Sequence, residues 1–195
     1  MRESPSHMRS DPAQALPSPM HEEYRRGDFL ISTDPALLDV TAIHAFLSGT
    51  DWARGVPIEI VARSLSNSLT FGLYHGGRQI GLARVITDRA TFGYVADVYV
   101  LEAYRGRGLA RWLMGCLVGH PGLQTVRRLL LSTHNAHALY AAFGFRPLKA
   151  PEDHLERRPP AAVSIDCAAA ASRSDGPGAR GRCVPGQSGG DSNNG

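Results

Sequence analysis

Three strand-like segments joined by two tight turns occupy residues 68–100, and they constrain the fold more than any other feature of the sequence. The segments SLTFGLY (68–74), RQIGLARVITD (78–88) and TFGYVADVYV (91–100) are rich in β-branched and aromatic residues. His75-Gly76-Gly77 is a glycine-containing hairpin signal between the first two segments. Because consecutive strands joined by short turns pair antiparallel, residues 68–100 predict a three-stranded antiparallel meander.

One strand and two helices are expected before this meander. The short apolar run DFLIST (28–33) predicts a first strand. Asp34 and Pro35 are a typical N-cap and first helical residue for a helix that ends at Gly49. A second short helix is expected from Pro57 through Leu65.

Helices and strands alternate after the meander. The apolar spacing of Leu109, Trp112, Leu113, Cys116 and Leu117 predicts an amphipathic helix over residues 108–119. VRRLLLST (126–133) predicts a buried strand, and a helical stripe from Ala136 to Phe143 ends at Gly144. Residues 145–148 are expected to form a final strand and residues 154–157 an edge piece. This order predicts an α+β domain with a central, mostly antiparallel sheet and helices on its faces.

The two ends of the chain differ in composition from its middle. The chain has 195 residues, 43% of them apolar, which suits one domain with a sizeable core. We expect residues 1–21 to be a disordered N-terminal segment, residues 22–160 to form the domain, and residues 161–195 to be a disordered low-complexity tail.

Bulk properties argue against several classes of protein. A net charge of +3 does not by itself imply nucleic-acid binding, which usually needs a concentrated basic face. Three cysteines cannot all pair, and the lack of a Cys-x-x-Cys or Cys/His pattern predicts no metal site. The sequence has no apolar run of membrane-span length, so we expect a cytoplasmic protein without membrane partners.

The stretch YRGRGLARWL (104–113) lies where a strand gives way to a helix. The first turn of a helix presents unpaired N–H groups and a positive dipole end, which bind phosphate. Gly106 and Gly108 allow close approach of the backbone, and Arg105 and Arg107 add positive charge. A solvated basic turn is the alternative on this stretch alone. Nucleic-acid binding fits less well because no aromatic stacking platform flanks the single Arg-Gly-Arg-Gly copy.

A second motif, NAHALYAAFGF (135–145), places Tyr140 on a helix directly after a strand. Taken with VADVYVLEAYRGRGLARWLM, it resembles the Gcn5-related N-acetyltransferase (GNAT) superfamily, whose acetyl-CoA signature is matched by Arg105, Gly108 and Ala110. The resemblance covers roughly residues 71–148, and more loosely residues 29–157. It implies a GNAT-like fold with a splayed strand pair.

The resemblance also implies how acetyl-CoA is bound as a co-substrate. The backbone of Val98, Tyr99 and Val100 would pair with the pantetheine arm. The pyrophosphate would bind the backbone N–H groups of Gly106, Arg107, Gly108, Leu109, Ala110 and Arg111. Many family members have an Asn seven residues before the tyrosine. That position is Thr133 here, with Asn135 two residues later, so either residue could make the polar contact.

The family's tyrosine, which protonates the departing thiolate, is matched by Tyr140. A phenol with a reference pKa of about 10 can donate a proton at neutral pH. A core aromatic is the alternative for this residue. The general base is left open among Asp97, Glu59 and His134, with Asp97 the main candidate because it lies on the signature strand. A backbone N–H of Val98 or Tyr99 would stabilise the oxyanion.

The resemblance predicts an acetyl-CoA-dependent N-acetyltransferase that moves an acetyl group to a primary amine by direct attack in a ternary complex. Trp52 is a candidate for the acceptor pocket, with a loop-anchoring tryptophan as the alternative. The alternatives for the function are an acetyl-CoA sensor on the same fold and, more distantly, an RNA-associated protein. Exposed sheet edges are compatible with a homodimer.

Overall fold

The computed structural model describes residues 21–157, which fall into two units. The first unit contains the described residues 21–147, with the sheet and the four α-helices. The second begins at Leu148, and its described residues, 148–157, contain the short 3-10 helix η4 (Pro151–Asp153). The predictions of terminal disorder concern residues that lie almost entirely outside this range. The domain limits 22–160 remain a prediction.

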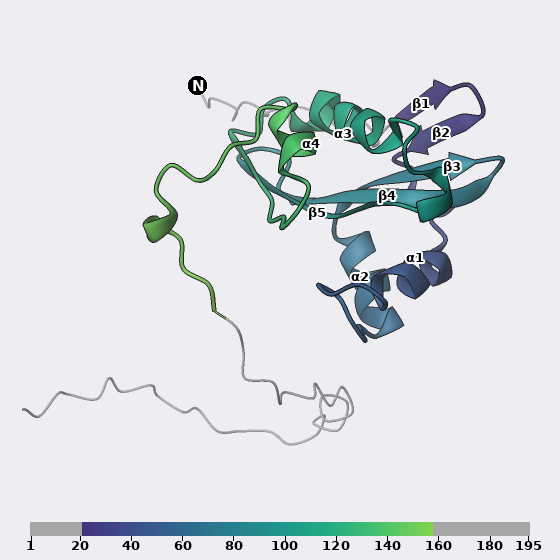
Figure 1. Ribbon diagram of the computed structural model, residues 1–195, viewed down its shortest axis with the longest axis horizontal. Coiled ribbons are helices and arrows are strands. Elements are labelled where there is room, and N and C mark those ends of the chain that lie inside the picture. Colours follow the sequence, from purple (N-terminus) through teal and green to yellow (C-terminus); the bar gives the residue numbers. More distant parts are fainter. Residues whose placement is uncertain (1–20, 158–195) are drawn as a thin grey trace, which may run out of the picture. The chain divides into compact units, whose positions relative to one another are not determined.

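A six-stranded sheet forms the centre of the first unit (Figure 1). Its strands are β1 (Glu23–Arg26), β2 (Phe29–Ser32), β3 (Leu69–His75), β4 (Arg78–Thr87), β5 (Phe92–Val100) and β6 (Arg128–Leu130). They lie in sequence order across the sheet. All neighbouring pairs are antiparallel except β5 and β6, which run parallel. The predicted meander of β3, β4 and β5 is confirmed.

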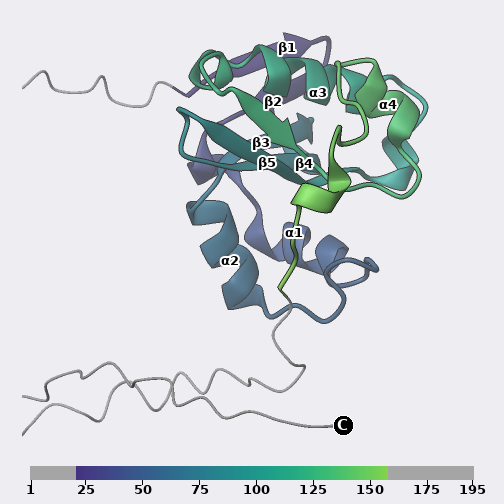
Figure 2. The same cartoon turned by 90° about the vertical axis from the view of Figure 1, so that its left-hand side faces the viewer.

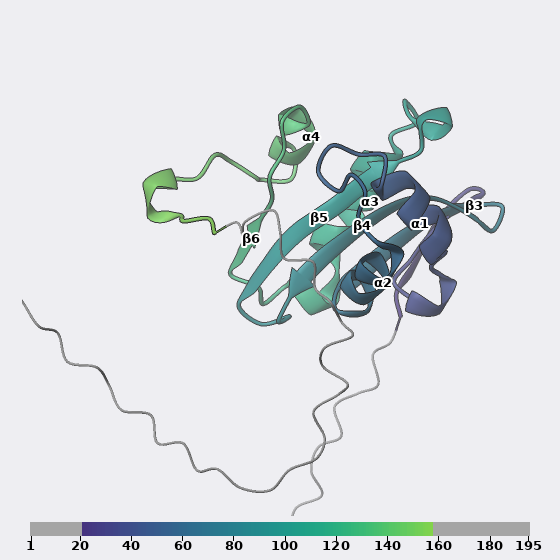
Figure 3. The same ribbon diagram turned by 90° about the horizontal axis from the view of Figure 1, so that it is seen from below.

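Helices cover both faces of the sheet. The helices α1 (Val40–Leu47) and α2 (Ile58–Ser66) lie on one face (Figure 3). The helix α3 (Leu109–Gly119) lies on the opposite face, with the short helix α4 (His137–Ala141) beside it (Figure 2). Short 3-10 helices occur at η1 (Pro35–Leu37), η2 (Glu102–Tyr104) and η3 (Pro121–Leu123). This is the α+β architecture expected from the sequence.

Each face of the sheet has its own hydrophobic core. Beneath α3 the core includes Phe71, Leu73, Val85, Leu113 and Leu117, all fully buried. Beneath α1 and α2 a smaller core gathers Ile43, Leu47, Val61, Leu65, Leu82 and Tyr99. Burying one such side chain contributes about 1.5–3 kcal/mol. The alternation of side chains along β4 and β5 distributes their residues between the two cores, so these two strands are held from both sides.

The single helix expected from Asp34 to Gly49 is wrong. The chain instead forms η1, leaves the helical conformation at Leu38 (φ −71°, ψ 125°), and begins α1 at Val40. Two successive caps explain the break. The side chain of Asp34 accepts a hydrogen bond from Ala36 N, and that of Asp39 accepts one from Ala42 N, both at 2.9 Å. An Asp N-cap takes an extended conformation, so Asp39 starts a new helix.

Three strand predictions also differ from the structure. β1 was not expected, and the strand predicted over residues 126–133 pairs only at Arg128–Leu130, where its side chains are exposed or half-buried. Residues 145–148 and 154–157 contain no strand. Pro147 lacks the N–H that a ladder requires, which disfavours pairing of the first of these segments.

Candidate active site

The strands β5 and β6 separate part-way along their length. Their parallel pairing is confined to Phe92–Tyr94 and Arg128–Leu130. β5 then continues to Val100, while no further ladder pair joins it to the described residues that follow β6. The β6-facing backbone edge of residues 95–100 is therefore open to pair with something other than a strand.

β5 contains a bulge shortly after its last pair with β6, Tyr94 with Leu130. Leu82 pairs with Tyr99 and Arg84 with Ala96, so Asp97 and Val98 together lie opposite the single residue Ala83. Asp97 takes a left-handed conformation with φ 52°. A bulge of this kind bends the strand and re-aims side chains, and bulges occur often beside active sites.

Of the three predicted pantetheine contacts, two have side chains in the cores. Tyr99 is 8% exposed and stacks on Phe46 with ring centroids 3.8 Å apart, and Val100 is 6% exposed. Val98 is half-buried against the core beneath α3. Tyr99 and Val100 can therefore offer a ligand mainly their backbone groups, which is what the sequence resemblance implied for them.

The turn before α3 has the geometry of an anion site. Gly106 and Gly108 have φ values of 77° and 70°, and Gly108 is the N-cap of α3. No side chain caps this helix, so the first N–H groups of α3 have no side-chain cap partner. A Cβ on either glycine would meet no atom within 4 Å. The left-handed backbone therefore accounts for glycine here, and the space above the turn can accept an anion.

The arginine side chains around this turn are engaged by the protein. Arg105 Nε donates to the carbonyl of Val100 at 3.1 Å and so ties the turn to the end of β5. The Arg107 guanidinium lies 5.6 Å from the ring centroid of Tyr104. Arg26 of β1 donates to the carbonyl of Arg107 at 3.0 Å and packs over Trp112. Sequence reasoning missed Arg26, because nothing in its own segment marks it.

Tyr140 lies on α4, against the core that also contacts Val98. Its ring is half-buried and meets Phe145 edge-to-face, with centroids 6.0 Å apart. Burial raises the pKa of the Tyr140 phenol above its ordinary value of 10.0. The hydroxyl therefore remains protonated at neutral pH and can act as a donor.

The other polar candidates fall into two groups. The hydroxyl of Thr133 accepts a hydrogen bond from Ala136 N at 3.1 Å and so orders the turn that leads into α4. Asn135, His134 and Glu59 are exposed. No hydrogen bond or ion pair links these three described residues to the bulge of β5, so their roles remain predictions.

Asp97 and Trp52, 45 residues apart in the sequence, meet in the structure. Trp52 Nε1 donates to Asp97 Oδ1 at 3.3 Å. Arg84 Nε donates to Asp97 Oδ2 at 2.5 Å, and Arg84 Nη1 donates to the hydroxyl of Ser68 at 3.1 Å. Arg84 was missed by sequence reasoning. The signal that could have identified it is a single charged residue in the apolar part of a central strand. A charge at such a position is usually paired with an opposite charge.

Comparisons with known proteins agree with this geometry. A family model described as an acetyltransferase (GNAT) domain matches residues 66–147. A protein of Gibberella zeae that is named as an acetyltransferase is 37% identical over 149 residues, which are 64% of this chain and 83% of that protein. The chain belongs to the GNAT acetyltransferase family.

Solved structures extend the comparison. A Xanthomonas campestris pv. campestris structure, described as belonging to the GNAT family, is 47% identical, with a TM-score of 0.67. The match covers 70% of this chain and 96% of that one. A Staphylococcus aureus structure shares the fold at 24% identity and a TM-score of 0.55, over 67% of this chain and 98% of that one. The chain is therefore an acetyltransferase by family, with a GNAT fold.

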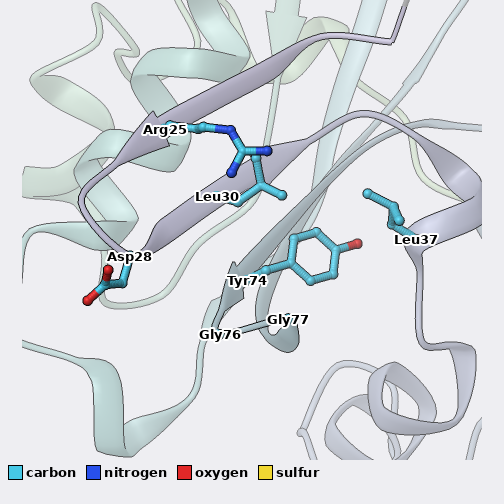
Figure 4. A pocket seen from close by; sticks show the side chains of 7 residues that line it. All are labelled: Arg25, Asp28, Leu30, Leu37, Tyr74, Gly76 and Gly77. Atoms are coloured by element: carbon cyan, nitrogen blue, oxygen red, sulfur yellow. The ribbon is translucent and has the colours of Figure 1, made fainter.

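A cavity of about 380 Å³ on this GNAT domain lies apart from the predicted site. It is lined by Arg25, Asp28, Leu30, Leu37, Tyr74, Gly76 and Gly77, none of which belongs to that site (Figure 4). Tyr74 packs over Gly72, where a Cβ would collide with the phenol ring. Burial raises the pKa of Tyr74 above its ordinary value, so its hydroxyl stays neutral.

Two further observations bear on partners of the GNAT domain. Among residues 21–157, no helix has the length and apolar character needed to cross a membrane. The same part of the chain contains no group of three or more His, Cys, Asp or Glu residues arranged to hold a metal ion.

Proposed function

We propose that this protein transfers the acetyl group of acetyl-CoA directly to a primary amine in a ternary complex. The observation that carries the proposal is the opening between β5 and β6, which lies in the same domain as the uncapped N-terminus of α3. A strand edge in need of partners suits the amide-bearing pantetheine arm. A helix N-terminus suits the pyrophosphate.

The residues around the opening suit the two parts of acetyl-CoA. The N–H groups of residues 106–111 would bind the pyrophosphate, and the backbone of residues 98–100 would pair with pantetheine. Arg105 and Arg26 support this arrangement from outside, because each donates a hydrogen bond to a carbonyl of the site, those of Val100 and Arg107. Bound acetyl-CoA supplies an activated acetyl thioester.

The protein would manage charge and protons during transfer. A backbone N–H at the bulge, that of Val98 or Tyr99, would stabilise the negative charge that develops on the thioester oxygen. Tyr140 would donate its phenolic proton to the departing sulfur, because partial burial raises the pKa of the phenol and keeps it protonated. The acceptor must lose a proton before it attacks. Asp97 as its base stays a prediction, which the hydrogen bonds to both carboxylate oxygens weaken.

An amine panel with thiol detection tests the proposal. The protein is mixed with acetyl-CoA and single amines, and release of free CoA thiol is followed while acetyl-CoA binding is measured by titration calorimetry. Binding together with amine-dependent thiol release supports an enzyme. Binding without release from a broad panel of amines would instead support an acetyl-CoA sensor, and absence of binding would contradict both. A cytoplasmic location and homodimer formation remain predictions from the sequence.

A further inference from the structure

Three side chains from separate segments form a connected group on the α1/α2 face of the sheet. Arg84 comes from β4, Asp97 from the bulge of β5, and Trp52 from the loop between α1 and α2. We call these three residues the Trp52 clamp. Ser68, directly before β3, accepts a hydrogen bond from Arg84 and so joins the clamp to the end of α2. The loop before α2 and the turn after α2 are thus both connected to the carboxylate of Asp97, the loop through Trp52 and the turn through Arg84.

The loop that carries Trp52 is held firmly. Gly55 N donates to the carbonyl of Ser48 at 3.2 Å, and the ring of His44 bonds the carbonyl of Val56 at 2.9 Å. Ala53 and Val56 pack against the core beneath α1 and α2. Trp52 is nevertheless 62% exposed. Its exposure is therefore a fixed feature of an ordered loop, in which the indole N–H is anchored and the ring faces solvent.

Charges around the indole are compensated within the protein. The side chains of Arg84 and Asp97 are 14% and 10% exposed, and each carboxylate oxygen of Asp97 accepts a hydrogen bond. In the loop itself, Asp51 pairs with Arg54 at 2.6 Å. An incoming cation would therefore find no free carboxylate at Asp97. What this part of the surface offers is a large apolar ring with a fixed orientation.

The position of the clamp relative to the proposed chemistry gives it a role. Asp97 directly precedes Val98 and Tyr99, whose N–H groups are the proposed oxyanion donors. The carboxylate that anchors the indole therefore belongs to the residue directly before the proposed oxyanion donors. We infer that Arg84 and Asp97 are positioning residues that hold Trp52 as a platform for the acceptor, and that the acceptor amine is borne on an apolar or aromatic body. This inference rests on the proposed function.

Direct binding tests the platform without any need for turnover. The chain contains two tryptophans, so Trp112→Phe leaves Trp52 as the single indole. Phenethylamine and spermidine are titrated against its fluorescence in the presence of CoA, which prevents acetyl transfer. Phenethylamine should perturb the emission at a concentration at least about tenfold lower than spermidine. Equal responses, or no response to phenethylamine, would overturn the inference even if the protein binds acetyl-CoA.

Kinetic variants test the positioning role. Trp52→Ala and Arg84→Ala should raise the KM for phenethylamine by about three- to tenfold, the scale of one aromatic contact, while the Kd for acetyl-CoA stays unchanged. Trp52→Phe keeps a platform but loses the bond to Asp97, so its KM should fall between wild type and Trp52→Ala. Arg54→Ala, in the same loop, is the control and should leave KM unchanged.

Two variants at position 97 separate the carboxylate from the backbone. Asp97→Gly keeps the left-handed conformation at no steric cost and removes the carboxylate. Asp97→Asn keeps the side-chain shape. The clamp predicts that Asp97→Gly raises the acceptor KM and that Asp97→Asn raises it less. Because Arg84→Ala could raise KM simply by unfolding the protein, Arg84→Lys is measured as well, and the folding of both variants is checked by circular dichroism. An unchanged acceptor KM in folded Asp97→Gly and Arg84→Lys would contradict the positioning role.

Discussion

Tyr140 combines a proton donor with an environment that keeps it protonated. Tyr140→Phe preserves the ring against Phe145 and removes only the hydroxyl. Loss of a general acid typically costs about 10²- to 10⁴-fold in rate, so kcat should fall within that range. The Kd for acetyl-CoA from calorimetry should change little. An unchanged kcat across the amine panel would remove Tyr140 from the chemistry.

Position 108 favours glycine because its backbone is in the left-handed conformation. At φ 70°, alanine would be strained by about 1–2 kcal/mol, and relief of that strain would turn the first N–H groups of α3 away from an anion. Gly108→Ala should weaken acetyl-CoA binding by about tenfold or more, the loss of one hydrogen bond to a charged group. Gly55, at φ 69° and equally uncrowded, provides the matched control. Gly55→Ala should destabilise the fold to a similar extent and leave acetyl-CoA affinity intact. Equal affinities for the two variants would contradict the anion site.

The role of a residue could be predicted from the sequence where a local motif determines it. It could not be predicted where the role depends on tertiary contacts. Gly108 and Tyr140 belong to local patterns that also determine their secondary structure. The meeting of Trp52 with Asp97 depends on a bulge that inserts one residue in β5 and changes its alternation. No sequence period signals that insertion. Arg26 contacts the turn before α3 from a strand at the far edge of the sheet, which only the strand order determines.

At the scale of elements, local sequence signals were sufficient to predict the β3–β5 meander. They were not sufficient to predict the limits of the first helix before it or of the strand β6 after it. β3, β4 and β5 follow alternation and tight turns, and their predicted limits agree with the structure to within one residue or so. The prediction of one helix over residues 34–49 was wrong because Asp34 and Asp39 are both capping residues. Asp34 caps the short helix η1, and Asp39 caps the separate helix α1. β6 is short because the chain leaves β5 there, which is a property of the pair and not of VRRLLLST alone.

The turn between β4 and β5 depends on one carboxylate. Asp88 Oδ1 accepts hydrogen bonds from the N–H groups of Ala90, Thr91 and Phe92, and Oδ2 accepts one from the Thr91 hydroxyl. These bonds, that of the hydroxyl first, hold the pKa of Asp88 well below its ordinary value of 3.8. Because the folded pKa is depressed, the stabilising contribution is present above the unfolded pKa and is lost as pH falls through the folded one.

Asp88→Asn therefore has a pH signature. Urea unfolding at pH 7 and pH 5 should show the same loss of stability relative to wild type. Below about pH 4 the difference should shrink, because wild-type Asp88 then loses its advantage as the unfolded carboxyl becomes protonated. Asp28→Asn, in the turn between β1 and β2, is the comparison. A difference for Asp88→Asn that stays constant down to pH 3 would show that the carboxylate charge does not hold this turn.

At the scale of the whole molecule, the two cores share the central strands, and tyrosines are embedded on both sides of the sheet. Tyr99 lies in the core beneath α1 and α2, and Tyr140 borders the core beneath α3. Burial raises the pKa values of both phenols above 10.0, and also those of Tyr24 and Tyr74. Ionisation of these tyrosines is thus coupled to the integrity of both layers.

This coupling predicts alkaline unfolding. A phenol whose folded pKa exceeds its unfolded value stabilises the protein fully below the unfolded pKa, near 10. As pH rises further, the unfolded chain loses the proton while the folded protein keeps it, so the free energy of unfolding falls. Absorbance at 295 nm should show that some of the six tyrosines ionise at higher pH in the folded protein than in the chain unfolded by guanidinium. The protein should unfold at a pH only slightly above that of this ionisation. Superimposable titrations of the folded and unfolded chain would mean that these phenols are not shielded by the two cores.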